Sequence, residues 1–466
     1  MEALSQNLQL EKEHTQQDAK KLDIALVNVL NNNKKYPMNK DLNGGFGTAD
    51  NYGNSLTSRI IKLIKKRSIK LPIISFAFLQ SILKEQGHNI EYFEGKLPEK
   101  FLDLILIYGT IVDYKNENKV CKLLKEKFPR SKIGFFGPFP SRNPDLFNSG
   151  DFVLLGESEA FFKNDFKELE QLNGPTKVSS VTDMDSIPSP SFDGFPINTY
   201  SYSPAISEKP FVVLQSSKGC PYTCRFYCTY AEYQGSKIRQ RSAKKVVDDI
   251  VNIQKKYNIK GIQLRDPTFG LTKGYIDEFC NELKKRNVKI KWGMETRLDL
   301  LNKENIKKMF EVGLRNINVG IETNNEIIAS QNKRKLIPLN HQEEIINFCK
   351  NIGIKVSAFY ILAYEGDTEE TIKNTINYAI KLNTPLARFA ISTPYPGTGF
   401  YDQLKKENRI LTEDYENYTQ FNLVWKHNNL SKEKVTELLE YALRKYYFRP
   451  SYLFMMLKWK IRELWL

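Results

Sequence analysis

The pattern of hydrophobic and polar positions in the first third of the chain predicts strands that alternate with helices. Short apolar runs of strand length are separated by longer stretches whose apolar residues recur at helical spacing. The predicted strands cover residues 22–29, 89–93, 102–108, 132–136 and 151–155, and the predicted helices cover residues 71–86 and 116–128. This alternation predicts an α/β domain with a mostly parallel, doubly wound sheet that binds ligands beyond the carboxyl ends of its strands.

A second series of strands and helices follows a stretch rich in proline and serine. Prolines recur from Pro175 to Pro210, where the hydrophobic pattern breaks, and this predicts a linker over residues 172–208. The later strands are predicted at residues 211–215, 261–265, 289–295, 316–321, 355–362 and 386–392, with helices at 243–256, 275–285, 303–311, 341–351 and 369–381. Repeated units of this length predict an incomplete barrel with its chemistry in the loops after the strands. The predicted organisation is a polar tail (1–20), an α/β domain (21–171), the linker (172–208), a partial barrel (209–400) and a helical region (401–466).

Composition and charge narrow the class of protein only slightly. Hydrophobic residues make up 41% of the chain and charged residues 26%, as in folded globular proteins. No apolar run reaches the roughly 18 to 20 residues that span a bilayer, and the start of the chain lacks the apolar stretch of a secretory signal, so we expect a cytoplasmic protein. The net charge of +15 is compatible with nucleic acid, a membrane surface or an anionic ligand. No nucleic-acid motif accompanies it, and a lysine-rich, solubilising surface is the simpler interpretation.

Three cysteines lie close together directly after the first predicted barrel strand. Cys220, Cys224 and Cys228 are near enough in sequence for their thiols to bind one metal centre. A structural zinc site needs four protein ligands. Between residues 89 and 279 the chain offers no fourth cysteine or histidine apart from Cys121, in the other predicted domain. Three ligands without a fourth predict a four-iron cluster with one iron left open for a small molecule.

The segment GCPYTCRFYCTY resembles the cysteine loop of the radical S-adenosylmethionine (SAM) enzymes. The family has three and then two residues between the cysteines, whereas this chain has three and three, and we expect the extra residue to form a bulge in the loop. The resemblance extends through KIRQRSAKKVVDDI, LRDPTFGLTKGYIDEFC, KWGMETRLDLL, VGLRNINVGIE, AFYILAYEGDTEETI and AISTPYPGTGFYD. It implies a 4Fe-4S cluster that binds the amino and carboxylate groups of SAM and donates one electron. Cleavage of SAM would then give methionine and a 5′-deoxyadenosyl radical that abstracts a substrate hydrogen.

Polar residues follow the predicted barrel strands, where such a fold places its active site. SAM carries an ammonium, a carboxylate, a sulfonium and a ribose diol, so it calls for both acidic and basic side chains. We predict that the catalytic residues are Glu295, Arg297 and Glu322. The residues expected to contact SAM are Asp266, Glu365, Tyr364 and Pro394, the last two beside the adenine. For any one carboxylate a capping or solvated role is an equal alternative, and a buried aromatic ring is more often part of the core.

The amino-terminal half resembles the Rossmann-like cobalamin-binding domain that precedes the barrel in class B radical SAM methyltransferases. The stretches that carry this resemblance are LDIALVN, GGFGTADNYG, LPIISFAFLQSILKEQGHNIEYFEG, LILIYGTIVDY, KIGFFGPFPS and LLGESEAFF. They imply cobalamin contacts from loops at the strand ends, at Tyr108, Val112, Asp113, Tyr114, Gly137, Pro138, Gly156 and Glu157.

Two features of this half depart from familiar motifs. The Asp-x-His-x-x-Gly motif of many cobalamin domains is absent, and His88 is expected in a surface turn, so cobalamin is expected to lack a histidine lower ligand. The sequence Gly44-Gly45-Phe46-Gly47 does not open a helix directly after a strand and is therefore a weak dinucleotide signal. We expect a flexible loop there, near the corrin.

Residues 441–466 mix basic side chains with aromatic ones, including Trp459 and Trp465. Such a helix can lie at a lipid interface or can pack on the barrel and close the active site, and we favour packing.

Three functions follow from these patterns. The leading one is a cobalamin-dependent radical SAM methyltransferase that methylates an unreactive carbon, one SAM supplying the methyl group and a second the radical. The second keeps both cofactors but catalyses a cyclisation or rearrangement without methyl transfer. The third is a basic scaffold, associated with lipid or RNA, that holds a structural cluster. For the enzyme we expect a small-molecule or lipid-like substrate, an external one-electron donor such as flavodoxin or ferredoxin, possible peripheral membrane contact through the carboxyl terminus, and no nucleic acid.

Overall fold

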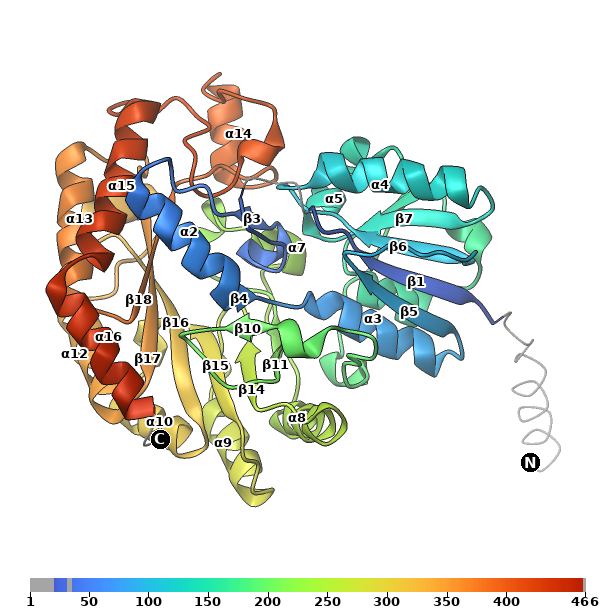
Figure 1. Ribbon diagram of the computed structural model, residues 1–466, viewed down its shortest axis with the longest axis horizontal. Coiled ribbons are helices and arrows are strands. Elements are labelled where there is room, and N and C mark those ends of the chain that lie inside the picture. The colour runs from blue at the N-terminus through green and yellow to red at the C-terminus, as the bar shows by residue number, and fades with distance from the viewer. Residues whose placement is uncertain (1–20, 32–35, 464–466) are drawn as a thin grey trace, which may run out of the picture.

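The computed structural model describes residues 21–31 and 36–463, which form two α/β bodies side by side (Figure 1). The first is built on a six-stranded parallel sheet in the order β5-β1-β6-β7-β8-β9. Its strands are β1 (Asp23–Asn28), β5 (Asn89–Glu94), β6 (Leu104–Tyr108), β7 (Lys132–Phe136), β8 (Phe152–Leu155) and β9 (Gly174–Lys177). Helices α3 (Ile74–Glu85) and α4 (Tyr114–Lys127) lie on opposite sides of this sheet in Figure 1. The central strands are continuous apolar runs because both faces of the sheet are covered.

The stretch predicted as a linker over residues 172–208 is partly structured, which corrects the sequence-based boundary. Within it, β9 pairs with β8 and adds a sixth strand to the first sheet. Pro175 is tolerated in β9 because this strand lies at the edge of the sheet, where a missing N–H breaks no ladder on the open side. Further along, β10 (Ser201–Tyr202) pairs with β4 (Ile69–Lys70). The stretch therefore contributes strands to both bodies.

The second body is the predicted partial barrel. Its six parallel strands follow one another in the order β11-β14-β15-β16-β17-β18, and among the described residues the edge strands β11 and β18 are not paired with each other. The strands are β11 (Phe211–Leu214), β14 (Gly261–Leu264), β15 (Lys291–Thr296), β16 (Leu314–Glu322), β17 (Lys355–Leu362) and β18 (Leu386–Ile391). The intervening helices are α8 (Ala243–Tyr257), α9 (Tyr275–Lys285), α10 (Lys303–Glu311), α12 (Leu339–Ile352) and α13 (Glu369–Leu382). Each carries an apolar stripe toward the sheet, as α9 does with Ile276, Phe279 and Leu283.

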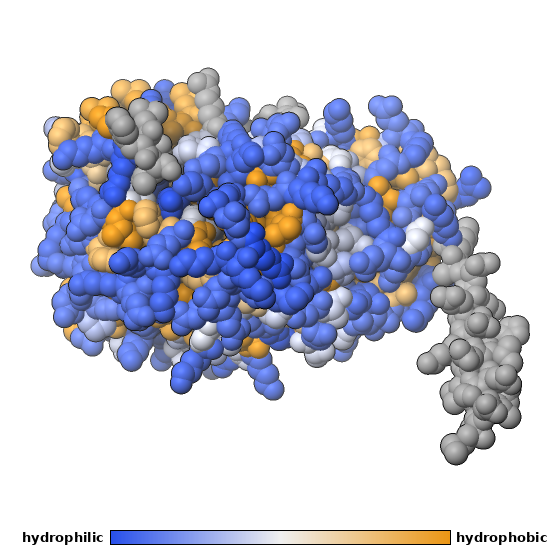
Figure 2. All heavy atoms as spheres, turned by 90° about the horizontal axis from the view of Figure 1, so that it is seen from below, coloured by the Kyte–Doolittle hydropathy of each residue, from blue (hydrophilic) through white to orange (hydrophobic). Residues whose placement is uncertain are grey.

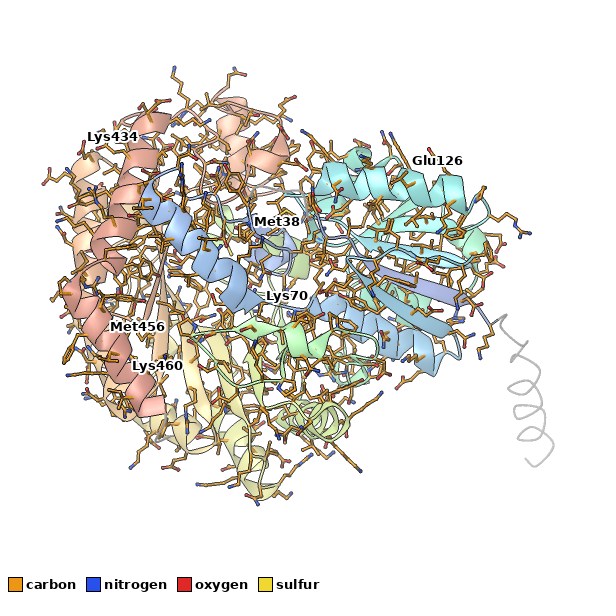
Figure 3. The ribbon with its side chains drawn as sticks, viewed as in Figure 1. Met38, Lys70, Glu126, Lys434, Met456 and Lys460 are labelled. Carbon is orange, nitrogen blue, oxygen red and sulfur yellow. The ribbon has the colours of Figure 1, made fainter. Side chains whose placement is uncertain are left out.

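Residues 36–70 leave the first sheet after β1 and cross to the barrel, and we call this segment the strap. It contains β2 (Met38–Asn39), β3 (Thr48–Ala49), α2 (Leu56–Ser68) and β4. Figure 1 shows α2 between β4 and α15 (Lys432–Tyr447), and Figure 3 labels Met38 and Lys70 near the two ends of the segment.

The strap closes the open side of the barrel because its two sides attach near the two edge strands. On one side β4 pairs with β10, which precedes β11. On the other side α2 packs against α15, which packs on β18. Glu440 of α15 fastens the start of α2 by accepting hydrogen bonds from the backbone N–H groups of Asn54 and Ser55, at 2.8 and 3.0 Å.

The carboxyl-terminal region is helical, as predicted, with α14 (Gly399–Lys406), α15 and α16 (Pro450–Glu463). Helix α16 buries Tyr452, Met455 and Trp459 and ends where Arg462 donates to the carbonyl oxygens of Lys350 and Asn351. It therefore packs on the outside of the barrel. Of the residues 441–466 expected to pack on the barrel and close the active site, Leu443 and Tyr447 of α15 line the cavity at the open side of the barrel. None of the described helices has both the length and the apolar character needed to span a bilayer.

Candidate active site

The cysteine loop follows β11 and the short strand β12 (Ser217–Lys218). Gly219 adopts a left-handed backbone with a φ of +88°, and a Cβ there would lie 1.9 Å from the carbonyl oxygen of Lys237. Only glycine fits this close approach. The next residue, Cys220, donates its backbone N–H to Gly235 over 3.1 Å, which fixes the start of the loop.

The extra residue between the second and third cysteines is absorbed in a turn. The backbone N–H of Cys228 donates to the carbonyl oxygen of Cys224 over 3.0 Å, which closes a single helical turn. The bulge expected from the sequence is therefore replaced by a hydrogen-bonded turn, for which three intervening residues are the natural length.

The three cysteines border one cavity of about 330 Å³ at the mouth of the barrel. Across residues 21–31 and 36–463, no three His, Cys, Asp or Glu side chains meet closely enough to hold a single metal ion. Burial raises the pKa of the Cys224 and Cys228 thiols, so their ionisation calls for positive charge such as iron provides.

Glu295, at the end of β15, is held by a polar cluster that borders the same cavity. Its carboxylate pairs with the guanidinium of Arg265 and accepts hydrogen bonds from Tyr230 Oη at 3.1 Å and from Asn318 Nδ2 at 3.4 Å. Arg265 also pairs with Asp41 of the strap at 2.9 Å. The carboxylate is thus held at the cavity by fixed partners.

Glu322 and Arg297, the other predicted catalytic residues, also line the cavity. Glu322 ends β16 with a φ of +66° and lies 3.5 Å from Arg334 Nη1. Burial raises the pKa of Glu322, whereas Arg334 and Arg297 oppose that rise. Arg297 stacks on the ring of Tyr222, 4.1 Å from its centre, and pairs with Asp299 at 2.8 Å.

Sequence reasoning missed two arginines at this site. Arg334 lines the cavity but comes from the irregular segment after α11 (Glu326–Gln331), where no periodic pattern points to it. Arg265 directly precedes the predicted Asp266, and its place at the end of a strand was a usable signal.

The residues expected to contact SAM do not line this cavity. Asp266 is buried beneath it and accepts hydrogen bonds from the backbone N–H groups of Ser216 and Ser217, so it fixes the turn after β11. Burial raises its pKa to about 6. Glu365 faces outward and pairs with Arg409 at 3.0 Å. Tyr364 is fully buried and Pro394 lies behind the lining, although the residues on either side of Pro394, Thr393 and Tyr395, do face the cavity.

The fold and this geometry agree with the comparisons to known proteins. Residues 214–379 match the model of the Radical SAM superfamily. The chain contains a radical SAM domain. It is 26% identical over 415 residues to the uncharacterized methyltransferase PH0819 of Pyrococcus horikoshii, which covers 82% of this chain and 89% of that protein. It is also 26% identical over 276 residues to the anaerobic magnesium-protoporphyrin IX monomethyl ester cyclase of Rubrivivax gelatinosus, which covers 59% of this chain and 48% of the cyclase.

A similar solved structure extends the comparison to the whole fold. It is the radical S-adenosylmethionine methyltransferase TsrM of Kitasatospora setae with cobalamin and a 4Fe-4S cluster bound. The TM-score is 0.58 at 13% identity, over 82% of this chain and 78% of that one. The expected resemblance to class B, methyltransferase-like radical SAM enzymes is confirmed.

In this radical SAM enzyme the predicted cobalamin contacts lie behind the strap. Tyr108 Oη donates to the carbonyl oxygen of Gly45 over 3.0 Å, and Asp113 pairs with Lys40 at 3.1 Å. Glu157 pairs with Arg239 of the cysteine loop region. Tyr108 and Pro138 line a small cavity of about 40 Å³, whereas six others line neither cavity: Val112, Asp113, Tyr114, Gly137, Gly156 and Glu157.

The glycine-rich sequence and His88 also have defined places in this radical SAM enzyme. Phe46 is fully buried and packs edge-on against Phe139 and Tyr395, so the expectation of a flexible loop is wrong. His88 accepts a hydrogen bond from the backbone N–H of Leu22 over 3.3 Å, at the amino ends of the strands. It thus lies at the opposite end of the sheet from the loops that face the barrel.

Proposed function

We propose that this radical SAM enzyme methylates an unreactive carbon of a small molecule, with cobalamin as the methyl carrier. The observation that carries the proposal is a single cavity bordered by the three cysteines, by the ion-paired Glu295 and Glu322, and by strap residues from the amino-terminal body. A methyltransferase-named relative that aligns over most of both chains supports methyl transfer rather than another radical reaction.

The residues at the cavity fit a cluster and SAM. Cys220, Cys224 and Cys228 would hold the cluster, which when bound supplies the electron that cleaves SAM. Arg297 and Arg334 would bind the carboxylate of SAM, and Glu295 would hold its ammonium group. The surrounding burial keeps bulk water away from the radical.

The strap side of the cavity fits the periphery of a corrin, which carries many amide groups. Asn39 and Asn43 line the cavity there, and Asn43 Nδ2 is buried without a hydrogen-bond partner among the described residues. An unsatisfied buried amide is costly unless a ligand completes it. Asn39, Leu42 and Asn43 would therefore hold cobalamin, which when bound carries a methyl group derived from SAM.

The test uses protein reconstituted anaerobically with iron, sulfide and hydroxocobalamin. We expect corrin absorption that stays with the protein, and 5′-deoxyadenosine when SAM and dithionite are added. Incubation with methyl-labelled SAM and a metabolite extract should give a labelled product. Protein that binds no corrin and forms no 5′-deoxyadenosine would overturn the proposal.

A cyclisation or rearrangement is the second candidate function, because the similar Rubrivivax protein is named as a cyclase. It predicts 5′-deoxyadenosine and a changed product that carries no label from the methyl group of SAM. The same incubation therefore separates the two reactions.

We also propose a cytoplasmic enzyme that receives its electron from a donor such as flavodoxin or ferredoxin and contacts a membrane surface through α16. Leu453, Phe454, Leu457 and Ile461 of α16 are exposed, and Lys460 lies near them on the same helix. Figure 3 labels Lys460 and Met456 on α16, and Figure 2 shows one largely hydrophilic face with separate hydrophobic patches. Apolar and basic side chains together favour an anionic lipid interface. Sedimentation with anionic but not with zwitterionic vesicles is the expected result, and loss of it in Leu457→Asp is the check.

A further inference from the structure

The cavity extends from the cysteine loop to a second region, which lies between the strap and β18 and which we call the strap end. Asp50, Tyr52 and Lys65 of the strap line it on one side, and Arg388 of β18 lines it on the other. These residues are far apart in sequence and are brought together because the strap closes the open side of the barrel. None of them has a role in the proposed cleavage of SAM.

The strap end carries more positive than negative charge. Lys65 Nζ lies 3.6 Å from Asp50 Oδ1, and Tyr52 Oη also contacts both groups. Asp50 is therefore shared between a lysine and a phenol. Arg388 donates to Gln420 Oε1 over 2.7 Å, and among the described residues it forms no ion pair with a carboxylate.

One buried polar group at this end, Nε of Arg388, has no hydrogen-bond partner among the described residues, and Arg388 lines the cavity. Buried polar groups in native proteins are almost always satisfied, and exceptions at a cavity wall point to a ligand. The N–H groups of a guanidinium can only donate hydrogen bonds, so the missing partner is an acceptor.

The protonation of Lys65 supports the same conclusion. Burial, and after it repulsion from Arg388, lower the pKa of Lys65 to about 8 despite the opposing effect of Asp50. A second negative charge beside these two cations would relieve that repulsion and restore the charged amine.

The walls next to this charged group are apolar. Ile61 and Ile69 of the strap, Phe359 of β17 and Leu443 of α15 line the same part of the cavity. A ligand that fills it would have an apolar body and one acidic group, and this combination excludes highly polar sugars and free inorganic ions as the natural occupant.

We propose that Lys65 and Arg388 bind the carboxylate or phosphate group of the substrate, whose apolar body lies between the strap and β17–β18. Calling this ligand the substrate rests on the proposed function. The site itself is an acid-binding subsite, and it places the other end of the molecule toward the cysteine loop.

The experiment measures how fast Lys65 reacts with formaldehyde and cyanoborohydride in the reconstituted full-length protein, by mass spectrometry of its peptide. The probes are inorganic phosphate, benzoate and, as the uncharged counterpart of benzoate, benzamide. Lys66, which is exposed on the same helix, provides the internal reference. At a probe concentration of twice its Kd, protection should slow the reaction of Lys65 about threefold, while Lys66 is unaffected.

Variants make the result specific to Arg388. Arg388→Gln should abolish protection and Arg388→Lys should retain part of it. The matched control is Arg315→Gln, because Arg315 is also a barrel arginine with a buried, unpartnered Nε but lies outside this cavity. Circular dichroism and a melting curve establish that each variant is folded.

Each outcome decides the proposal or its chemistry. Protection by phosphate alone assigns a phosphate ester, and protection by benzoate alone assigns a carboxylate. Equal protection by benzamide or equal loss in Arg315→Gln would overturn the subsite. The measurement of Lys65 reactivity needs no electron donor and no SAM. A lack of protection can therefore be distinguished from a failure to form 5′-deoxyadenosine.

Discussion

The two ends of the cavity differ in how their charges are balanced. At the cysteine end each arginine has an acidic partner, in the pairs Arg265–Glu295, Arg297–Asp299 and Arg334–Glu322. At the strap end Lys65 shares Asp50 with a tyrosine, and Arg388 has only neutral partners among the described residues. The cysteine end is therefore a preorganised set of ion pairs, whereas the strap end has positive charge that remains available for an acidic ligand.

The two ends differ equally in how the chain builds them. The cysteine end comes from successive loops of one barrel, between Cys220 and Arg334. The strap end combines a crossover from the amino-terminal body with β18 and with α15 near the carboxyl terminus. The residues proposed for SAM cleavage thus come from neighbouring loops of one barrel. The residues proposed for substrate recognition come from segments that are distant in sequence and meet only in the folded chain.

The largest effect is expected from Cys224→Ala at the cysteine end. Loss of a thiolate ligand should prevent assembly of the cluster, and formation of 5′-deoxyadenosine should fall by at least about 100-fold, since even outer-sphere partners of metal sites contribute 10- to 100-fold. Chromatography of the SAM cleavage products measures this. The control is Cys280→Ala, because Cys280 is buried on α9 away from the cavity. If Cys224→Ala still cleaved SAM, the cluster could not be bound by the cysteine loop.

Arg334→Gln should weaken SAM binding without removing the cluster. The change deletes a charged donor at the cavity and leaves Glu322 buried without its cation, so the pKa of Glu322 should rise further. A hydrogen bond to a charged group contributes about 1.5 to 3 kcal/mol, which corresponds to roughly 10- to 150-fold in Kd. Equilibrium dialysis with labelled SAM gives the Kd, and iron content shows whether the cluster remains. Arg225→Gln, which changes an exposed arginine of the cysteine loop, is the control, and an equal loss there would contradict the assignment.

Much of the barrel and of the cysteine end could be predicted from the sequence, because hydrophobic periodicity reflects local secondary structure. Strand β17 and helices α9 and α10 have the bounds that the pattern predicts. The cysteines, Glu295, Arg297 and Glu322 were placed at the cavity because residues after parallel strands meet at one edge of a barrel.

The strap could not be predicted in the same way. Helix α2 buries few apolar residues and exposes Leu56, Leu63 and Ile64, and the strands of the strap are only two residues long. The position of Lys65 depends on the crossing of the chain between the two bodies, which no local pattern encodes. For the same reason the sequence placed Gly44–Gly47 in a flexible loop, whereas the structure buries Phe46 between both bodies.

The pH dependence of Lys65 reactivity tests the excess charge at the strap end. With a pKa of about 8, the free amine of Lys65 increases about tenfold per pH unit up to pH 8 and then levels off, whereas an ordinary lysine continues to rise toward pH 10. The groups that face it are Asp50, Tyr52 and Arg388, and Tyr447 of α15 interacts in turn with Tyr52. Rates of reductive methylation between pH 6 and pH 10 give the midpoint.

Two variants should move this midpoint in opposite directions. Arg388→Gln removes a repelling charge and should raise the pKa of Lys65, whereas Asp50→Asn removes an attracting one and should lower it. If the Lys65 midpoint moved in the same direction in both variants, burial rather than the balance of charges would set the reactivity of Lys65.

The smallest effect is expected from loosening the strap while leaving both sets of charges in place. Glu440→Ala removes the carboxylate that accepts the backbone N–H groups of Asn54 and Ser55, a loss of about 1 kcal/mol at this partly exposed position, or about fivefold in local opening. Hydrogen exchange measured by mass spectrometry should therefore quicken about fivefold at the start of α2, and anion protection of Lys65 should weaken with it. Formation of 5′-deoxyadenosine should stay unchanged, because the cysteine end does not depend on this contact. Glu437→Ala, one turn earlier on α15 and exposed, is the control. If SAM cleavage fell together with strap protection, the two ends would form one cooperative unit, and the separation of chemistry from recognition would not hold.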